Sequence, residues 1–479
     1  MPEATSSYGY GGKRGTSQAA PVVSGSIAFL KSAFPFLHSS EIIEILRETA
    51  NTNGIGYDSA NHADTIYGAG LLDLGKATSY YIPPTSADGS TMSMATLSGT
   101  TTDSAYVNLS NTNLTVSPQM SDALLAALPS TFTIFDKYKR PFEVNTSRYI
   151  SVTHAGYKAL KNDVAYIVPN TKIKETRDGN LTFAYAQGAL NSANGFGFAD
   201  TSYKMGKIES GFYLSENTRY KTRDNKHADL SNPFMSFTSA YGAHIGYQLN
   251  PKYGFKLQAV SGRNGLYGGD KDFNDRTFKK SAYAVDGELN FKAGKHLDMS
   301  IVSGMLYEDE ALLGLTGSGA FGLPQSRTYF TGITAQYKAT SKLSLSGSYY
   351  QGYTQAAAFN SNMLHTSALI SSSFALDANY KLNKTTDFGL RLSSPLRVEH
   401  GKLRVDMASG RDYYSDTVYR NQYSASLKPQ KREYKLAVYG NKEVTENLSV
   451  SSELGVRFNP EHRAGANDYR ALFGFAWNF

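Results

Sequence analysis

Apolar and polar side chains alternate along the C-terminal part of this chain, from roughly residue 207 to residue 479. In one segment Val285 and Leu289 alternate with Asp286 and Glu288. A period of two, repeated over many segments of about ten residues, is the pattern of β-strands. It predicts that most of the chain folds into β-sheet. The residues expected on the apolar side include Met235, Phe237, Tyr241, Ile245, Tyr247, Leu249, Tyr283, Val285, Leu289, Phe291, Phe374, Leu376, Ala378, Tyr380, Leu382, Leu448, Val450, Leu454, Val456 and Phe458.

The polar positions of these segments carry full charges. A soluble β-sandwich also alternates, but charges on one side and apolar residues with Tyr and Phe near the strand ends on the other are typical of a membrane barrel with a water-filled lumen. The sequence holds 34 Tyr and 25 Phe but one Trp. No apolar run approaches the ~18 residues that a spanning helix needs. The alternation therefore predicts an antiparallel β-barrel of the outer membrane.

The connections between the predicted strands alternate in length. Outer-membrane barrels place short turns in the periplasm and long loops outside. Counting in this way predicts about twelve strands with both ends periplasmic, although residues 386–431 can be divided in more than one way. The short links are expected at residues 250–252, 293–295, 340–342, 383–385 and 441–443, and the long ones near 218–233, 263–279, 309–325, 353–365 and 459–468.

The last predicted strand alternates Tyr469, Ala471, Phe473, Phe475, Trp477 and Phe479. A terminal strand that ends on an aromatic residue resembles the signal by which bacterial outer-membrane barrels are recognised for insertion. The resemblance implies two partners, namely the barrel-insertion machinery, through the strand ending at Phe479, and outer-membrane lipid.

Residues 15–25 read Gly-Thr-Ser-Gln-Ala-Ala-Pro-Val-Val-Ser-Gly and open an apolar helix. Ser17 lies where the unpaired N–H groups of a first helical turn can receive the negative charge that develops in acyl transfer. Pro21 falls in that turn, where its missing N–H costs little. The alternative is that Ser17 only caps the helix. Because the run resembles the segment around the nucleophilic serine of subtilisin-like serine peptidases, Ser17 is the expected catalytic nucleophile.

A second stretch, from Tyr67 to Ala77, resembles the GxGxxxxxxA element that closes the catalytic domain of the same family. Between the two, Ser39 and Glu41 give a helix start signal. The resemblance covers about residues 8–78 and implies the truncated C-terminal end of an α/β subtilase domain. Since that family supplies its triad in the chain order Asp, His, Ser, the acid, the histidine, the oxyanion asparagine and the central sheet would lie upstream of Ser17.

Other histidines offer alternative sites. A triad is recognised by geometry rather than by order, so a substitute within the chain is conceivable. All four candidate histidines fall in polar turns or predicted outer loops, where a surface position is the simpler interpretation. The candidates are His38 and His62, with Asp58 and Asp64 nearby in sequence, and the outer-loop residues His365 and His462, for which the sequence offers no evident acidic partner. No metal or cofactor site is predicted.

The pattern divides the chain into residues 1–78, 79–206 and 207–479. Residues 79–117 are rich in Ser, Thr, Asn and Gly, which is linker composition. Pro118 to Leu128 predicts a short helix that Pro129 ends. Residues 131–135 and 181–185 predict strands on the passenger side of the barrel.

The net charge is +7, but Lys and Arg are scattered over loops and polar strand positions. Nucleic acid is therefore not an expected partner. The chain has no Cys, which fits an exported protein. Its first residues show neither the basic region nor the apolar region of a signal peptide. Because an outer-membrane protein is exported with such a peptide, we expect the chain to be a piece of a longer protein.

A subtilase segment followed by such a barrel resembles the autotransporter family, in which a passenger crosses the outer membrane with the help of its own C-terminal barrel. The resemblance implies a serine endopeptidase that acts on polypeptides at the surface of a Gram-negative bacterium, with the barrel as translocator. The alternatives are a non-catalytic outer-membrane barrel and the product of a decayed gene.

Overall fold

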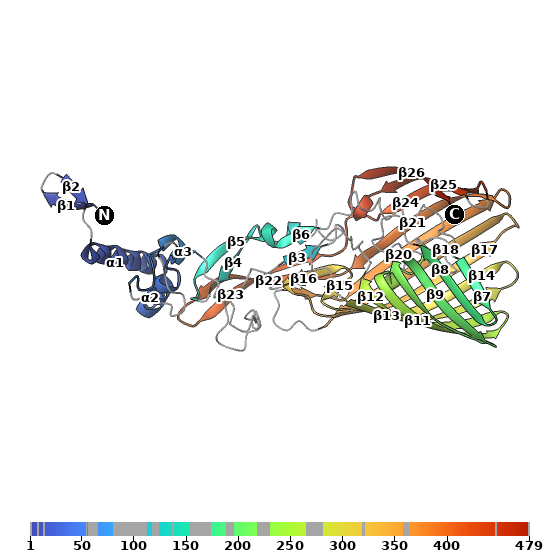
Figure 1. The fold of residues 1–479 in the computed structure, drawn as a ribbon, viewed down its shortest axis with the longest axis horizontal. Coiled ribbons are helices and arrows are strands. Elements are labelled where there is room, and N and C mark those ends of the chain that lie inside the picture. The colour runs from blue at the N-terminus through green and yellow to red at the C-terminus, as the bar shows by residue number, and fades with distance from the viewer. Residues whose placement is uncertain are drawn as a thin grey trace. The chain divides into compact units, whose positions relative to one another are not determined.

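The computed structural model has a mainly β fold, as the alternation predicts (Figure 1). Contacts divide it into two compact units, called unit 1 and unit 2. Unit 1 comprises residues 1–110, 131–145 and 407–421, and unit 2 comprises residues 111–130, 146–406 and 422–479. The structure describes residues 2–6, 9–12, 15–53, 55, 66–79, 113–116, 124–136, 138–152, 174–187, 196–217, 230–264, 281–318, 321–357, 364–445 and 448–477.

The helices of unit 1 are α1 (Thr16–Ala33), α2 (Ser39–Glu48) and α3 (Leu74–Thr78). Unit 1 also holds the hairpin of β1 (Pro2–Ser6) and β2 (Gly9–Gly12), the hairpin of β4 (Thr131–Phe135) and β5 (Pro141–Asn145), and part of β22 (Lys402–Asp412) and β23 (Thr417–Ser426). The helical core is apolar and contains the buried residues Leu30, Leu37, Ile42, Ile45, Leu46, Ala77 and Tyr138.

The two helix starts expected in the first segment, at Gln18 and after Ser39, lie within two residues of the observed ones. α1 begins at Thr16 after Gly15, whose φ of 153° lies in the region that favours glycine. α2 is capped by His38 rather than by Ser39, and the N–H of His38 donates to Oε2 of Glu41 at 2.7 Å. This bond is the backbone half of a capping box, which satisfies a donor that the helix cannot pair internally.

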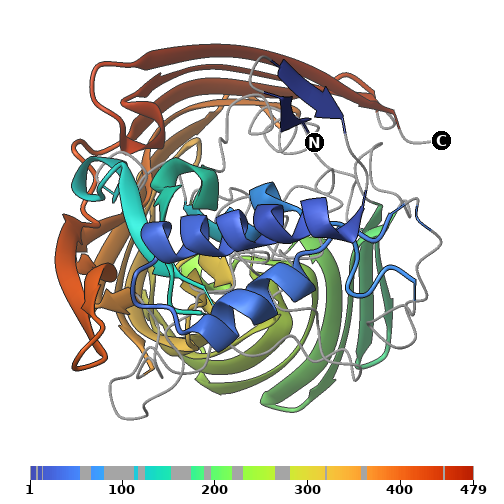
Figure 2. The ribbon, with the colours of Figure 1, turned by 90° about the vertical axis from the view of Figure 1, so that its left-hand side faces the viewer.

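The main sheet of unit 2 is antiparallel throughout. Its order has fifteen strands and runs β26-β25-β24-β21-β20-β18-β17-β14-β13-β12-β11-β10-β9-β8-β7. Figure 2 shows the strands following one another around a curve. The strands are β7 (Lys174–Asp178), β8 (Leu181–Gln187), β9 (Phe196–Met205), β10 (Ile208–Asn217), β11 (Phe237–Asn250), β12 (Tyr253–Asn264), β13 (Ser281–Ala293), β14 (Leu297–Glu308), β17 (Ser326–Lys338), β18 (Leu343–Ala356), β20 (Leu369–Lys381), β21 (Thr386–His400), β24 (Tyr434–Glu443), β25 (Leu448–Phe458) and β26 (Asn467–Trp477).

The sheet starts earlier than residue 207. Residues 181–185, which the sequence suggests as a passenger-side strand, belong to β8 and pair with β9, which in turn pairs with β10. Among the described residues, twelve strands of the main sheet follow residue 207, and β7, β8 and β9 extend the same sheet. A two-residue turn at Gly206 and Lys207 joins β9 to β10, and this short link is one that the connection count does not include.

The ambiguous stretch of residues 386–431 contains one long strand of the main sheet and a separate hairpin. β21 is followed by β22 and β23, which pair with β19 (Leu364–Thr366) in a sheet of their own, before the chain returns to the main sheet in β24. A third sheet joins β15 (Ala311–Leu312), β16 (Leu315–Ser318), β3 (Asn113–Val116) and β6 (Ile150–Val152). Short 3₁₀ helices lie at Thr146–Tyr149, Pro233–Met235 and Pro460–His462.

The two faces of the main sheet differ in the way that the alternation predicts. On β13, Tyr283, Val285 and Leu289 are exposed whereas Asp286 is buried. The prediction is wrong at Met235 and Phe237, which are both buried. At Phe237, the first residue of β11, a register shift between Thr238 and Tyr241 explains the difference, because one extra residue moves the preceding side chain to the other face. Met235 ends the 3₁₀ helix before β11, where strand alternation does not apply.

Aromatic rings cross from one strand to a glycine of the next on the buried face. Tyr350 lies opposite Gly332, and Tyr439 lies opposite Gly389. A Cβ at Gly389 would lie 2.4 Å from Cζ of Tyr439, and one at Gly332 would lie 2.2 Å from Cδ1 of Tyr350. Only glycine leaves room for a ring at these two places. Each tyrosine of these pairs therefore needs the glycine directly opposite it on the neighbouring strand.

Four of the five predicted short links lie between strands. The fifth is wrong, because β24 continues through residues 441–443 and pairs as far as Glu443 with Ser449. Of the predicted helix at 118–128, residues 124–127 are helical and residues 118–123 lie outside the described part. Among the described residues, no helix is long and apolar enough to cross a membrane.

Candidate functional site

Ser17 is the second residue of α1, and its side chain is exposed. The N–H of Gln18 donates to the carbonyl of Gly15 at 3.2 Å, which makes the tight turn into the helix. Within the described residues, the Ser17 hydroxyl has no hydrogen-bond partner. Ser17 therefore lies exposed at a helix start, and among the described residues no base lies within hydrogen-bond distance of its hydroxyl.

The first alternative triad is only partly described. His38 lies at the cap of α2, exposed, with its N–H bonded to Glu41. Asp58, His62 and Asp64 lie outside the described residues. In the described part of the chain, no group of three or more His, Asp or Glu side chains is arranged to hold a metal ion.

His365 has an acidic partner that the sequence does not reveal. Its Nε2 lies 3.2 Å from Oδ2 of Asp406, with His365 on β19 and Asp406 on β22. Nε of Arg404 lies 3.6 Å from the other oxygen of the same carboxylate. The carboxylate is therefore shared between an imidazole and a guanidinium, which is the arrangement of a structural ion cluster. The pairing could not be predicted from the sequence because Asp406 lies 41 positions after His365.

His462 is buried and ends the short 3₁₀ helix that connects β25 to β26. Each of its two ring nitrogens faces a backbone group. Its Nδ1 accepts the N–H of Glu433 at 2.8 Å, and its Nε2 lies 3.2 Å from the carbonyl of Leu396. This pattern is that of a neutral imidazole with its proton on Nε2. Burial lowers the pKa of His462 from 6.5 to about 3, and three nearby cations act in the same direction. Such a histidine fixes a loop and is not available as a general base.

A network of ionised groups lies on the buried face of the main sheet. One side chain from each of five neighbouring strands takes part: Asp377 (β20), Arg391 (β21), Tyr439 (β24), Glu453 (β25) and Arg470 (β26). Nε of Arg391 lies 3.2 Å from Asp377 and its Nη1 lies 3.9 Å from Glu453. The hydroxyl of Tyr439 donates to Asp377 at 3.0 Å, and Arg470 is paired with Glu453.

The negative and positive charges of this network compensate one another. Two carboxylates face two guanidinium groups, and the guanidinium of Arg391 lies 4.8 Å from the ring centroid of Tyr439. Sequence parity places Asp377 and Glu453 on the polar face, but it does not reveal their partners. The register of five strands brings them together.

A second cluster lies where β21 ends and β24 begins. Arg397 and Arg432 both pair with Glu399, and Arg432 also donates to the hydroxyls of Ser372 and Ser394. Burial lowers the pKa of Arg432 below its usual value, and the cation of Arg397 acts in the same direction. One carboxylate shared by two guanidinium groups holds the ends of neighbouring strands together.

Residues 3–70 of the chain match the Subtilase family, Peptidase S8. The match includes Ser17 and stops within the second stretch at Gly70. It spans a minor part of the chain and contains helices α1 and α2. A comparison with curated proteins finds no match.

Among solved structures, the chain is similar to outer-membrane barrel proteins at low sequence identity. OmpT of Vibrio cholerae shares 10% identity, with 63% of this chain and 84% of that chain covered and a TM-score of 0.35. The anion-selective porin from Comamonas acidovorans shares 10% identity, with 64% and 87% covered and a TM-score of 0.39. A bacterial polysaccharide outer-membrane secretin shares 8% identity, with 63% and 82% covered and a TM-score of 0.31.

Proposed function

We propose that unit 2 is an outer-membrane β-barrel and that it carries a subtilase-type segment to the cell surface. The observation that carries the barrel assignment is the inverted polarity of the main sheet. Many large apolar side chains of its strands are exposed, whereas several of its charged side chains, among them Asp286, Asp377, Arg391 and Glu453, are buried.

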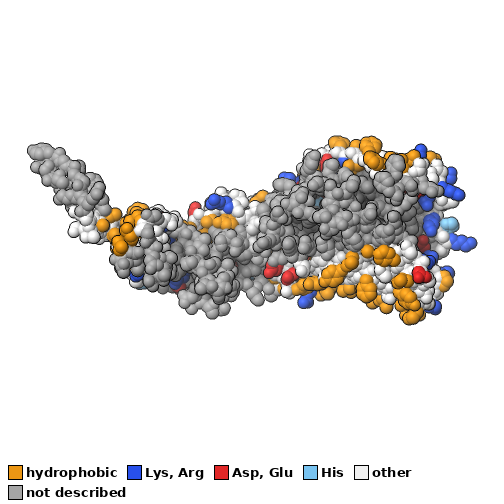
Figure 3. Space-filling model, in the orientation of Figure 1, with side chains coloured by type: hydrophobic (Ala, Val, Ile, Leu, Met, Phe, Trp, Pro, Cys, Tyr) orange, Lys and Arg blue, Asp and Glu red, His pale blue; other side chains and the backbone are white. Residues whose placement is uncertain are grey.

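The inversion holds on neighbouring residues of the same strands. Leu390 is exposed next to the buried Arg391, and Leu454 is exposed next to the buried Glu453. Water makes this arrangement costly, because apolar surface stays hydrated while charges lose their hydration. Lipid makes it favourable, because the apolar face meets hydrocarbon and the charged face meets a lumen. Figure 3 shows hydrophobic side chains over much of the strand surface in view.

The edges of the strands support the same assignment. Each main-sheet strand from β10 to β25 pairs with a neighbour on both sides, so its backbone N–H and C=O groups find partners within the sheet, whereas β26 and β7 are the two edge strands of the sheet order. Hydrocarbon offers no substitute for such partners, so only pairing of this kind is compatible with a membrane. Tyr469, Phe473 and Phe475 of β26 are exposed, which suits a strand that contacts lipid and the insertion machinery.

The enzymatic part of the proposal concerns Ser17. In a subtilase the serine attacks the scissile carbonyl, the histidine accepts its proton, and the acid orients the histidine. Ser17 has the motif and the helix start that this role needs. The substrates would be polypeptides, and the passenger would act at the cell surface of a Gram-negative bacterium.

Surface display tests the proposal. The chain would be produced in a Gram-negative host behind an added export signal, with an epitope tag at its N-terminus. We expect the protein in the outer-membrane fraction, with heat-modifiable migration on gels and with the tag accessible to antibody on intact cells. Folded protein whose tag is reached only after permeabilisation would contradict the translocator role. Protein recovered without membrane, in a folded state, would contradict the barrel.

A further inference from the structure

The hairpin of β22 and β23 contributes to both compact units. After β21 the chain leaves the main sheet and forms β22 and β23. Residues 407–421 of this hairpin belong to unit 1 together with the three helices. Unit 1 therefore combines segments that are distant in sequence, namely the helices, the β4–β5 hairpin and this hairpin tip. Contacts among these segments cannot follow from chain proximity alone.

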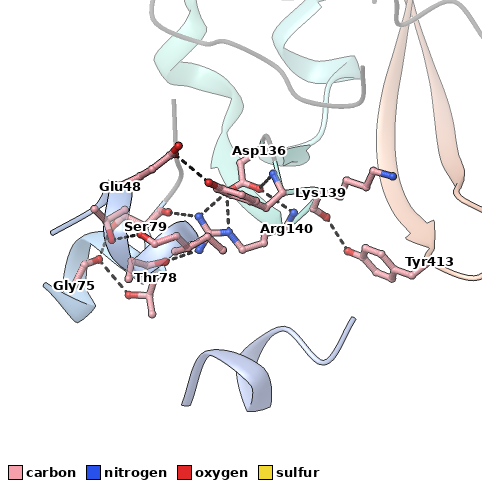
Figure 4. A network of polar contacts seen from close by, with 12 residues as sticks. Glu48, Gly75, Thr78, Ser79, Asp136, Lys139, Arg140 and Tyr413 are labelled. Atoms are coloured by element: carbon pink, nitrogen blue, oxygen red, sulfur yellow. Dashed lines mark hydrogen bonds and ion pairs between the residues drawn. The ribbon is translucent and has the colours of Figure 1, made fainter. Parts of the chain in front are cut away.

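The turn between β4 and β5 inserts two side chains among the helices. Tyr138 is a member of the helical core, and its hydroxyl donates to Oε2 of Glu48 at 3.0 Å. Arg140 is 0% exposed, and its guanidinium donates to the carbonyls of Ala77 and Ser79 at the end of α3 (Figure 4). These carbonyls have no donor within their own helix, so Arg140 completes the end of α3.

A carboxylate of the same turn neutralises Arg140. Asp136 accepts from Nη2 of Arg140 at 2.6 Å, and its other oxygen accepts the N–H groups of Tyr138 and Arg140, each at 3.0 Å. The guanidinium also lies near the rings of Phe34, which follows α1, and Phe142 on β5, 5.1 and 5.4 Å from their centroids. The turn is thereby fixed in the shape that presents Arg140 to α3.

The tip of the β22–β23 hairpin provides the second contact. The ring of Tyr413 stacks on Phe36, with centroids 3.7 Å apart and an interplanar angle of 8°. The hydroxyl of Tyr413 donates to the carbonyl of Lys139 at 3.1 Å. Nζ of Lys139 lies 2.9 Å from Asp416, which also pairs with Arg411. Tyr413 thus touches both the connection between α1 and α2 and the β4–β5 turn.

We infer that the Asp136–Arg140 turn and the tip of the β22–β23 hairpin form a noncovalent clasp for residues 16–79, so that cutting the chain between residues 79 and 131 does not release the helices. Buried aromatic and arginine side chains are the kind that dominate stable protein interfaces. The clasp would keep the subtilase-type segment bound to the barrel-bearing part of the chain after proteolysis. The inference does not depend on the membrane location, because every contact lies within unit 1.

Cutting the full chain tests the clasp. A recognition sequence for a site-specific protease is introduced after Gly99, and the folded protein is immobilised in detergent through a C-terminal tag. After cleavage and washing, the retained N-terminal fragment is quantified. Heat-modifiable migration of the same samples checks that the rest of the chain is folded.

Two neighbouring tyrosines provide a matched pair of variants. Tyr413 makes the contacts above, whereas Tyr414 is fully exposed on the same hairpin tip. We expect the wild type and Tyr414→Ala to retain the fragment, and Tyr413→Ala to lose it at least about tenfold faster. Immediate loss from the wild type, or equal retention by the two variants, would overturn the clasp. Tyr138→Phe, which keeps the ring but removes the bond to Glu48, should weaken retention less than Tyr413→Ala does.

Discussion

Arg391 and Asp377 occupy directly opposed positions on β21 and β20, with Nε of Arg391 3.2 Å from Oδ2 of Asp377 and both side chains 3% exposed. Their sequence neighbours Leu390 and Leu376 are exposed on the other face. Two charges in an apolar core cost several kcal/mol to desolvate, and pairing does not always recover that cost. A charged pair opposite an exposed leucine pair is therefore better explained by a polar lumen and a lipid-facing exterior.

The first prediction is that the two groups are energetically coupled. Arg391→Gln leaves Asp377 and Glu453 with less cationic charge, so the free energy of unfolding in detergent should fall by about 2–3 kcal/mol. Asp377→Asn should lower the free energy of unfolding by a similar amount. The double variant should show a coupling of about 1–2 kcal/mol in urea-induced unfolding.

An exposed ion pair supplies the control for that cycle. Lys338 and Asp298 lie 3.8 Å apart on β17 and β14, with both side chains largely in solvent. Their coupling should stay below about 1 kcal/mol, because solvent screens such pairs. Equal coupling in the two cycles would show that the buried network contributes no more than a surface pair.

The second prediction concerns the orientation of β13. Leu289 is 42% exposed, and its neighbour Glu288 faces the side of Asp286. Leu289→Arg should destabilise the folded barrel by about 2–4 kcal/mol if residue 289 lies near the bilayer midplane, whereas Glu288→Arg should be tolerated. Heat-modifiable gel migration after folding into lipid measures the folded fraction. Equal tolerance of the two substitutions would mean that the outward face is assigned to the wrong parity.

The alternation predicts the faces of regular strands well because side chains in a strand point to opposite sides in turn. On β13 and β25 the sequence is enough to separate Leu289 from Asp286 and Leu454 from Glu453. It fails at Phe237 because a register shift changes the parity within β11, and at Met235 because that residue ends a 3₁₀ helix rather than belonging to the strand. It predicts a strand at 181–185 but not that this strand belongs to the main sheet, because pairing with distant strands is not visible in local alternation. It also misses β7, since the short polar strand Lys174–Asp178 carries no alternation.

The candidate site is predictable only as far as local motifs reach. The helix after Gly15 and the glycines near residue 70 follow from sequence, because both depend on local backbone geometry. The partner of His365 and the burial of His462 depend on pairing between distant strands. Likewise, the sequence does not predict the burial of Arg140, which depends on its contact with the end of α3.

The third prediction tests the close approach of a ring to a glycine. A Cβ at Gly389 would clash with the ring of Tyr439, whereas at Gly440 on the neighbouring strand the nearest atom would be 3.6 Å away. Gly389→Ala should lower the free energy of unfolding by about 1–3 kcal/mol, because the ring or the strand must move. Gly440→Ala should change it by less than about 1 kcal/mol. Urea unfolding of the two variants in detergent compares them, and an equal effect would argue against the ring packing.

The fourth prediction is a pH dependence that arises from His462. Its folded pKa of about 3 lies below the ordinary value of 6.5, so the unfolded chain binds a proton over that interval and the folded chain does not. Stability contributed by the neutral form is full above pH 6.5 and is lost as the pH falls toward 3. The loss should be about 1.4 kcal/mol per pH unit within this window.

Substitution by glutamine isolates the titration of His462. His462→Gln should be less stable than the wild type at pH 7.5, but its stability should fall less steeply between pH 6 and pH 4 (about one bound proton fewer). Urea unfolding at each pH gives the slopes. Identical slopes for the wild type and His462→Gln would show that His462 is not buried in its neutral form.

The last prediction is that this polypeptide by itself does not hydrolyse peptides. Ser17 is exposed at the start of α1 and has no hydrogen-bond partner among the described residues. Loss of the histidine from an assembled serine triad lowers kcat by about 10⁶-fold, since the hydroxyl is a weak nucleophile without a base. Folded chain should therefore leave a fluorophosphonate probe unreacted at Ser17, while an intact subtilase reacts under the same conditions. Labelling that Ser17→Ala abolishes would contradict the prediction. If His38→Ala or His62→Ala also abolished that labelling, Ser17 would belong to a triad within this chain.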